Sequence, residues 1–180
     1  MKTVYIAVVF SLIIFVSGCT MPSFTSEDDI EVAIVQKLVN EYGYQSLNCL
    51  TADPDDLNDG SGRANKREVV FHECLKAAAL RINPGIPESA IDEALATLTA
   101  SRAAMSTIAA NREIDGLIRD GIPVEYQNEA GRNEHDRVRV IDFKRENGED
   151  RNEYLAVTQL WVRGVTRYRR PDVIIYINGL

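Results

Sequence analysis

The stretch that decides the fold is Arg170-Pro171-Asp172-Val173-Ile174-Ile175-Tyr176-Ile177-Asn178-Gly179-Leu180, at the end of a sequence of 180 residues. Residues 173–177 are all apolar, which predicts a strand buried on both faces. Proline is tolerated where a strand starts, so Pro171 places Asp172 at the edge of the sheet. Asn178-Gly179 predicts a two-residue hairpin turn, because both turn positions need positive φ. A hairpin needs a returning strand, so we expect this sequence to stop before the strand that completes its sheet.

Upstream of this stretch the hydrophobic period changes from that of helices to that of strands. Ser26 is placed to cap a first helix and Gly43 to end it. Further helices are predicted over residues 67–82, 87–98 and 105–118, and further strands over 138–143 and 154–162. Residues 51–62 are polar and are predicted to be a solvated loop. Helices followed by strands predict an α+β or α/β domain with one sheet.

Composition limits the possible classes of function but does not identify one. The content of 45% hydrophobic and 26% charged residues is ordinary for one soluble globular domain. With a formal net charge of -7, any contact with DNA must be local or helped by a cation or a partner. Such a local cluster precedes Asp172: Arg163, Arg167, Arg169 and Arg170 either contact phosphates or form a solvated basic loop. The three cysteines form no CxxC pair, which indicates neither a zinc site nor a disulfide framework.

A carboxylate at a sheet edge is what a metal-dependent nuclease requires. Such enzymes gather carboxylates there to hold Mg²⁺, which polarises the scissile phosphate and activates the attacking water. Asp172 occupies this kind of position. Taken alone, however, a Pro-Asp pair more often marks a turn than a metal site.

A series of segments in one order carries a more specific signal. They are Asn111-Arg112, residues 121–126 (GIPVEY), residues 138–143 (VRVIDF), Asn152-Glu153-Tyr154, Gln159, Arg170-Pro171-Asp172 and Asn178-Gly179-Leu180. Over residues 21–180 the chain resembles the N-terminal nuclease domain of the R subunit of type I restriction enzymes. The resemblance implies a restriction-endonuclease-like α/β core of the PD-(D/E)xK type, preceded by helices and incomplete at its C-terminus. It also implies cleavage of DNA phosphodiesters in the cytoplasm.

The resemblance also assigns residues, cofactors and partners. It implies that Asp172 is the catalytic, metal-binding aspartate and that Glu31 is a second acidic residue near the metal. Gln159 matches a position in the preceding strand, where a buried structural amide is the competing interpretation. The family's Glu-x-Lys pair is expected on the strand after the Asn178-Gly179 turn, so the given chain is expected to be inactive by itself. The implied cofactors are Mg²⁺ and, for the full-length protein, ATP; the implied partners are double-stranded DNA and the specificity and modification subunits.

Residues 1–20 give a different signal from the rest. Lys2 precedes an apolar run that ends in Val16-Ser17-Gly18-Cys19, a pattern typical of the lipobox at which bacterial lipoproteins are acylated on cysteine. The alternative function is therefore a non-enzymatic envelope lipoprotein anchored to the membrane through Cys19. If instead translation starts at Met21, residues 1–20 are a spurious extension and the protein is cytoplasmic.

Overall fold

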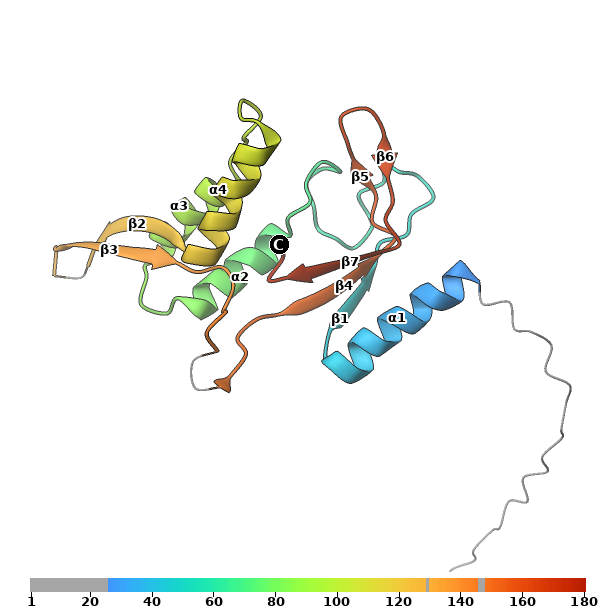
Figure 1. Cartoon of the computed structure of the whole chain (residues 1–180), viewed down its shortest axis with the longest axis horizontal. Helices are drawn as coiled ribbons and strands as arrows, with labels where there is room; N and C mark the ends of the chain where they lie inside the picture. Colours follow the sequence, from blue (N-terminus) through green and yellow to red (C-terminus); the bar gives the residue numbers. More distant parts are fainter. Residues whose placement is uncertain (1–25, 129, 146–147) are drawn as a thin grey trace, which may run out of the picture.

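The computed structural model describes residues 26–128, 130–145 and 148–180, and Figure 1 shows the arrangement of their elements. A sheet of three strands lies in the middle, with helix α1 (Glu27–Tyr42) along one side. The other helices and a long β-hairpin lie on the other side. Within these described ranges no helix is both long and apolar enough to cross a bilayer. The mixed α+β class is confirmed, whereas the restriction-endonuclease-like core remains an expectation.

Helix α1 has the ends that the sequence predicts. The Ser26 hydroxyl accepts the backbone N–H of Asp29 at 3.1 Å, and the Asp29 carboxylate accepts the backbone N–H of Ser26 at 3.0 Å, forming a capping box. The hydrogen bond from the Ser26 side chain lowers the pKa of Asp29. Gly43 ends the helix at a φ of 72°. None of the residues of α1 is buried, and Ile34 is 46% exposed.

The central sheet consists of β1 (Gln45–Asn48), β4 (Tyr154–Thr158) and β7 (Val173–Ile177), in the order β1-β4-β7. Strand β1 is parallel to β4, and β7 is antiparallel to it. In the described part of the chain, β7 pairs only with β4. The prediction of a strand at residues 173–177 is confirmed, but burial on both faces is not: Tyr176 is 4% exposed and Ile175 49%.

The predicted strand at residues 154–162 is divided in two. It leaves the sheet at Gln159, whose φ is 57°, a left-handed conformation that a non-glycine residue rarely adopts. Beyond this bend, β5 (Val162–Arg163) pairs with β6 (Tyr168–Arg169) in a separate small hairpin. The Gln159 N–H donates to the carbonyl oxygen of Asp172 at 3.1 Å, which holds the two chain segments together at the bend.

The single predicted sheet is wrong: the described strands form three sheets. β2 (Ile122–Gln127) and β3 (Asn133–Val138) pair as an isolated antiparallel hairpin. A strand was predicted at residues 138–143, but β3 ends at Val138, where that strand was expected to begin. Beyond it, the Arg139 N–H donates to Asn83 Oδ1 at 2.9 Å and the Val140 carbonyl accepts from Asn178 Nδ2 at 2.8 Å. Side-chain amides thus take the place of a neighbouring strand.

The remaining helices are α2 (His72–Ile82), α3 (Glu88–Thr99) and α4 (Thr107–Asp120). Helix α2 starts later than the predicted residue 67, because the backbone N–H of Phe71 donates to the Gly179 carbonyl at 2.9 Å instead of joining a helical turn. These helices and the β2–β3 hairpin enclose a core whose buried residues are Leu75, Ala79, Ala90, Ile91, Ala94, Leu95, Leu98, Ile122, Val124, Val138 and Val140. A second, smaller core lies at the central sheet: Cys49, Phe71, Val157, Leu160 and Tyr176.

The Asn178-Gly179 turn is confirmed. Ile177 and Leu180 exchange backbone hydrogen bonds of 3.1 and 3.0 Å, and the φ values of Asn178 and Gly179 are 54° and 84°. Gly179 is required for a second reason, since a Cβ there would lie 2.5 Å from the Phe71 carbonyl oxygen. The Asn178 side chain is buried, accepts the Glu153 N–H at 2.7 Å and donates to the Val140 carbonyl. The turn therefore joins the sheet to the helical part.

Candidate functional site

The predicted catalytic residues meet at one end of the central sheet. Thr158 is the register partner of both Asn48 and Val173, so the end of β4 lies beside the end of β1 and the start of β7. Gln159 follows β4 and Asp172 precedes β7 at this end. Glu31, on the first turns of α1, reaches the same place. Three segments far apart in the sequence therefore supply one cluster, which we call the sheet-end cluster: Glu31, Gln159 and Asp172.

Gln159 holds the sheet-end cluster together by two hydrogen bonds. Its side-chain Nε2 donates to Glu31 Oε2 at 2.6 Å, and its backbone N–H donates to the Asp172 carbonyl at 3.1 Å. The residue has a φ of 57°, and its side chain reaches Glu31 on α1. The prediction of a buried structural amide is correct in part, since the side chain is half-buried and hydrogen-bonded. Its bond to Glu31 was not predicted, because no local pattern links residues so distant in sequence.

The chemistry available at this cluster is that of hard oxygen ligands. Asp172 is exposed and Glu31 is half-buried, so a solute can approach both. Mg²⁺ is usually bound by one or two carboxylates, keeps several waters and accepts substrate phosphate oxygens. In the described ranges no group of three or more His, Cys, Asp and Glu side chains is arranged to hold a metal ion. The residues therefore fit an open Mg²⁺ site and not a closed metal cage.

The small β5–β6 hairpin carries the predicted DNA-contacting arginines. Arg167, Arg169 and Arg170 are all exposed, and they precede Asp172 directly in the chain. The Arg170 guanidinium lies 5.1 Å from the centroid of the Trp161 ring, over its face, and so contributes a cation–π contact. The structure thus places the basic cluster next to the sheet-end cluster, where a phosphate backbone would lie if the metal site acted on DNA.

A buried ion cluster beneath this hairpin was not predicted. Asp59 Oδ2 lies 2.7 Å from Lys66 Nζ and 3.0 Å from an Arg63 guanidinium nitrogen, and all three side chains are almost fully buried. Burial alone would raise the pKa of Asp59, but hydrogen bonds from Lys66, Ser61 and Arg63 outweigh it and hold that pKa far below its usual range. The expectation that the whole loop 51–62 is solvated is therefore wrong at Asp59, which lies 4% exposed.

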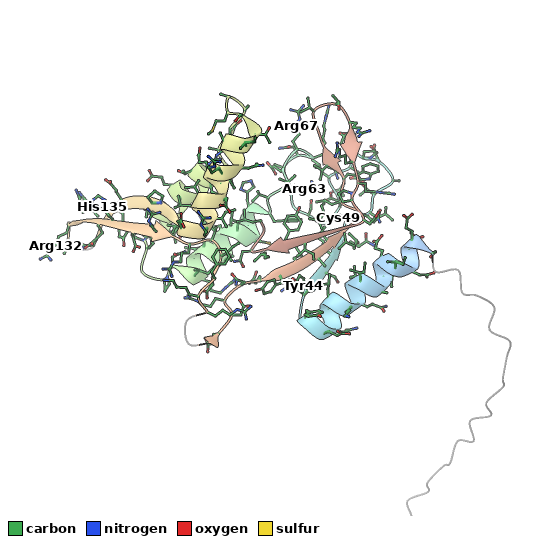
Figure 2. All side chains as sticks on the ribbon, viewed as in Figure 1. Tyr44, Cys49, Arg63, Arg67, Arg132 and His135 are labelled. Atoms are coloured by element: carbon green, nitrogen blue, oxygen red, sulfur yellow. The ribbon has the colours of Figure 1, made fainter. Side chains whose placement is uncertain are left out.

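Cys49 lies beside this ion cluster, as Figure 2 shows for Cys49 and Arg63. Burial, and next the negative charge of Asp59, raise its thiol pKa to about 11. A thiol with so high a pKa is a poor nucleophile near neutral pH. Cys49 is therefore a small buried side chain and Cys74 is half-buried, whereas Cys19 lies outside the described residues.

Comparison with known proteins decides the family. The family described as "Type I restriction enzyme R protein N terminus" matches residues 24–180. This chain belongs to that family. It is also 34% identical over 159 residues, or 86% of its length, to the "Type I restriction enzyme HindI endonuclease subunit" of Haemophilus influenzae. The chain spans 14% of the length of that relative. No solved structure matches the chain.

Membership in the type I R-protein family confirms the resemblance found in the sequence and leaves its finer assignments as predictions. The roles of Asp172, Glu31 and the arginines stay predictions. The match begins after residues 1–20, which, like residues 21–25, lie outside the described part of the structure. The lipobox therefore stays a prediction as well.

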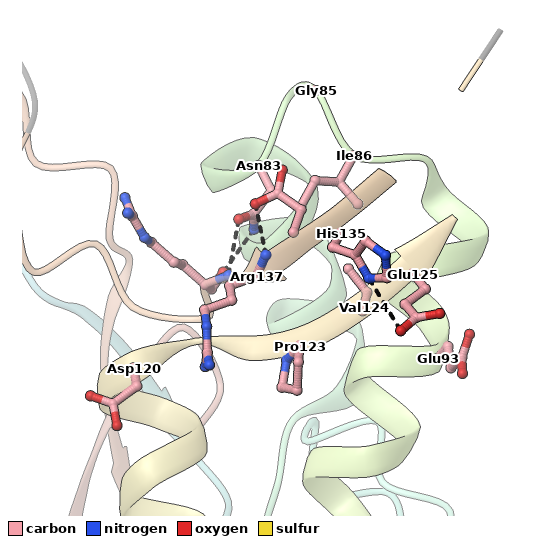
Figure 3. Close-up of a pocket in the computed structure, with 12 residues that line it drawn as sticks. Asn83, Gly85, Ile86, Glu93, Asp120, Pro123, Val124, Glu125, His135 and Arg137 are labelled. Atoms are coloured by element: carbon pink, nitrogen blue, oxygen red, sulfur yellow. Dashed lines mark hydrogen bonds and ion pairs between the residues drawn. The ribbon is translucent and has the colours of Figure 1, made fainter. Parts of the chain in front are cut away.

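A cavity of about 1010 Å³ lies elsewhere, beside the β2–β3 hairpin (Figure 3). Acidic and basic side chains line it, and His135 Nδ1 lies 3.2 Å from Glu125 Oε1. None of the predicted catalytic residues lines it. In Figure 1 this hairpin lies at the left and the β5–β6 hairpin at the upper right. The cavity is therefore separate from the sheet-end cluster.

Proposed function

We propose that this domain cleaves DNA phosphodiester bonds with Mg²⁺ as part of a type I restriction-modification system, and that the sheet-end cluster binds the metal. The observation that carries the proposal is the bond between Gln159 and Glu31, which brings α1 to the sheet end where Asp172 lies. Family membership supplies the reaction class. Double-stranded DNA and the specificity and modification subunits are the proposed partners, and ATP is a proposed cofactor of the full-length protein only.

The residues of the cluster have separate roles. Asp172 and Glu31 supply carboxylate oxygens, and Gln159 fixes the position of the Glu31 carboxylate. Because Asp172 is exposed, the scissile phosphate could reach a metal ion bound there. Bound Mg²⁺ would supply a Lewis acid for that phosphate and would lower the pKa of the attacking water. Arg167, Arg169 and Arg170 would hold the adjoining phosphates by charge-assisted hydrogen bonds.

The cluster is expected to be a weak catalyst without further groups. It contains no lysine to stabilise the charge that develops on the phosphate. By the chain's resemblance to the family, a Glu-x-Lys pair would supply these further groups. We therefore expect the 180 residues alone to cleave DNA slowly or not at all. Robust nicking of plasmid DNA that Asp172→Asn abolishes would show that other residues complete the site.

Metal binding tests the proposal without requiring cleavage. Calorimetric titration of the chain with Mg²⁺ or Mn²⁺ should show one site, weakened about tenfold or more by Asp172→Asn or Glu31→Gln. Glu41→Gln is the matched control, because Glu41 is also a glutamate on α1 but is exposed and pairs with Lys37 at 3.9 Å. Equal affinity in all four proteins would refute a metal site at the sheet end.

The lipoprotein alternative makes a different prediction. The lipoprotein alternative rests on Cys19 and the apolar run before it. We propose instead that the working protein starts near Met21 and is cytoplasmic. Cells expressing the protein and fed a labelled fatty acid should leave it unlabelled. A label that Cys19→Ala removes would establish the membrane anchor and refute the cytoplasmic assignment.

A further inference from the structure

The tip of the β5–β6 hairpin exposes an apolar side chain completely. Val165 is 100% exposed, between Arg163 and Arg167, which are also exposed. The tip is closed by the Gly164 N–H, which donates to the Arg167 carbonyl at 3.0 Å. A valine fully in water contributes no core packing to the folded chain. Its position at the end of a projecting hairpin suits a contact with a partner.

The base of the same hairpin is held firmly. The Trp161 and Tyr168 rings lie edge to face, 6.2 Å apart, and the Trp161 Nε1–H donates to the Thr51 carbonyl at 3.3 Å. The Arg163 N–H donates to the carbonyl of Lys66, whose ammonium group pairs with the buried Asp59. The hairpin is therefore anchored to the buried ion cluster, and its tip is presented at a fixed place.

The charge of the hairpin selects an anionic partner. Residues 159–171 contain four arginines and no aspartate or glutamate, in a chain whose formal net charge is -7. Arg163 lies over the Tyr168 ring, 5.7 Å from its centroid, and Arg170 over Trp161. A local positive element in an acidic chain gives a short-range contact with phosphates and does not coat nucleic acid generally.

The shape of the hairpin fits one groove of DNA. The major groove of B-form DNA admits a two-stranded β-ribbon, and apolar side chains there contact the thymine methyl group. We propose that the β5–β6 hairpin enters the major groove of duplex DNA, with Val165 against base edges and Arg163 and Arg167 on the flanking phosphates. This inference rests on the proposed function in one respect only, namely that the ligand is DNA. It places Asp172 of the sheet-end cluster, which follows the hairpin in the chain, at the backbone beside that groove.

A comparison of two duplexes tests the proposal. A-form RNA has the same phosphate charge as DNA, but its major groove is too deep and narrow for side chains to read. Fluorescence anisotropy with a short labelled DNA duplex and an RNA duplex of the same sequence, in EDTA, should show tighter binding to DNA. Val165→Ala should weaken DNA binding about fivefold and leave RNA binding unchanged. Arg167→Ala should weaken binding to both and reduce the slope of log affinity against log salt by about one.

The controls separate this proposal from the nuclease assignment. Ile108→Ala is the matched control, since Ile108 is 75% exposed and lies on α4. Circular dichroism should be unchanged in all three alanine variants. Groove entry would be refuted if the chain bound DNA and RNA equally, or if it did not bind DNA at all. It would also be refuted if Val165→Ala bound DNA as tightly as the unmodified chain. Because EDTA removes the metal, failure of the nuclease proposal would appear only in the metal titration and would leave these affinities unchanged.

Discussion

The two halves of the described structure are held together by different forces. The half made of α2, α3, α4 and the β2–β3 hairpin encloses a continuous apolar core of eleven buried residues. The half around the central sheet has a core of five, and its helix α1 has no buried residue. That half depends instead on polar links, such as Gln159 to Glu31 and Asp59 to Lys66. Residues proposed to bind metal and DNA all lie in the half with less apolar packing.

This difference fits the chemistry of the sheet half. A metal site needs carboxylates that water and phosphate can reach, and such groups cannot be enclosed in an apolar core without a large cost. Hydrogen bonds and ion pairs are directional, so they can fix a side chain that remains accessible. The comparison predicts that replacing a buried polar side chain lowers stability most in the sheet half. Truncating a buried apolar side chain should lower stability most in the helical half.

The largest effect is expected in the sheet half, at Asp59. Asp59→Asn leaves Arg63 and Lys66 buried without their counter-charge, which should lower the free energy of unfolding by about 3–5 kcal/mol. Urea denaturation measures this change. Asp53→Asn, at an exposed aspartate of the same loop, is the control and should change stability by less than about 1 kcal/mol. Similar losses in both variants would mean that the buried ion cluster does not hold this half together.

The same residue predicts a dependence on pH. The pKa of Asp59 is lowered in the folded protein, so its contribution to stability is complete above the ordinary carboxyl pKa of about 4 and is lost as the pH falls below it. Between pH 7 and pH 3 the urea midpoint of the unmodified chain should therefore fall more steeply than that of Asp59→Asn. Parallel midpoints would contradict a carboxylate with a lowered pKa at this position.

In the helical half the largest effect should come from an apolar truncation. Leu75 is fully buried in the larger core, so Leu75→Ala should lower the free energy of unfolding by about 2–5 kcal/mol. Ile34→Ala on α1 should cost less than about 1 kcal/mol, because Ile34 is already 46% exposed. Equal losses in urea would show that α1 is buried in solution as deeply as α2, which would remove the contrast between the halves.

The smallest change in stability, but a clear change in function, is expected for Gln159→Gly. Glycine relieves the strain of a φ of 57°, worth about 1–3 kcal/mol, and removes a hydrogen bond worth about 1 kcal/mol, so stability should change little. Mg²⁺ affinity should fall about tenfold, because Glu31 loses the group that positions it. Arg145→Gly is the control, since Arg145 also has positive φ, at 45°, and lies outside the cluster. Unchanged Mg²⁺ affinity in Gln159→Gly would remove Gln159 from the site.

Much of the local structure follows directly from the sequence. The capped start of α1 at Ser26, its end at Gly43, the strand at residues 173–177 and the turn at Asn178-Gly179 were all predicted. Each depends on interactions between residues a few positions apart, and the preferences of single residues report such interactions well. The order of the matched segments was enough to give the family.

Only the tertiary structure decided which residues meet. Gln159 and Glu31 are separated by 128 positions, and no periodicity in either segment reports their contact. The sequence predicts a solvated loop around Asp59, but Asp59 is buried because it pairs with Lys66 and Arg63. The predicted sheet is replaced by three, and after β3 the side chains of Asn83 and Asn178 bind the backbone at Arg139 and Val140. Local propensity sets the elements, whereas packing and hydrogen bonding between distant segments set the site.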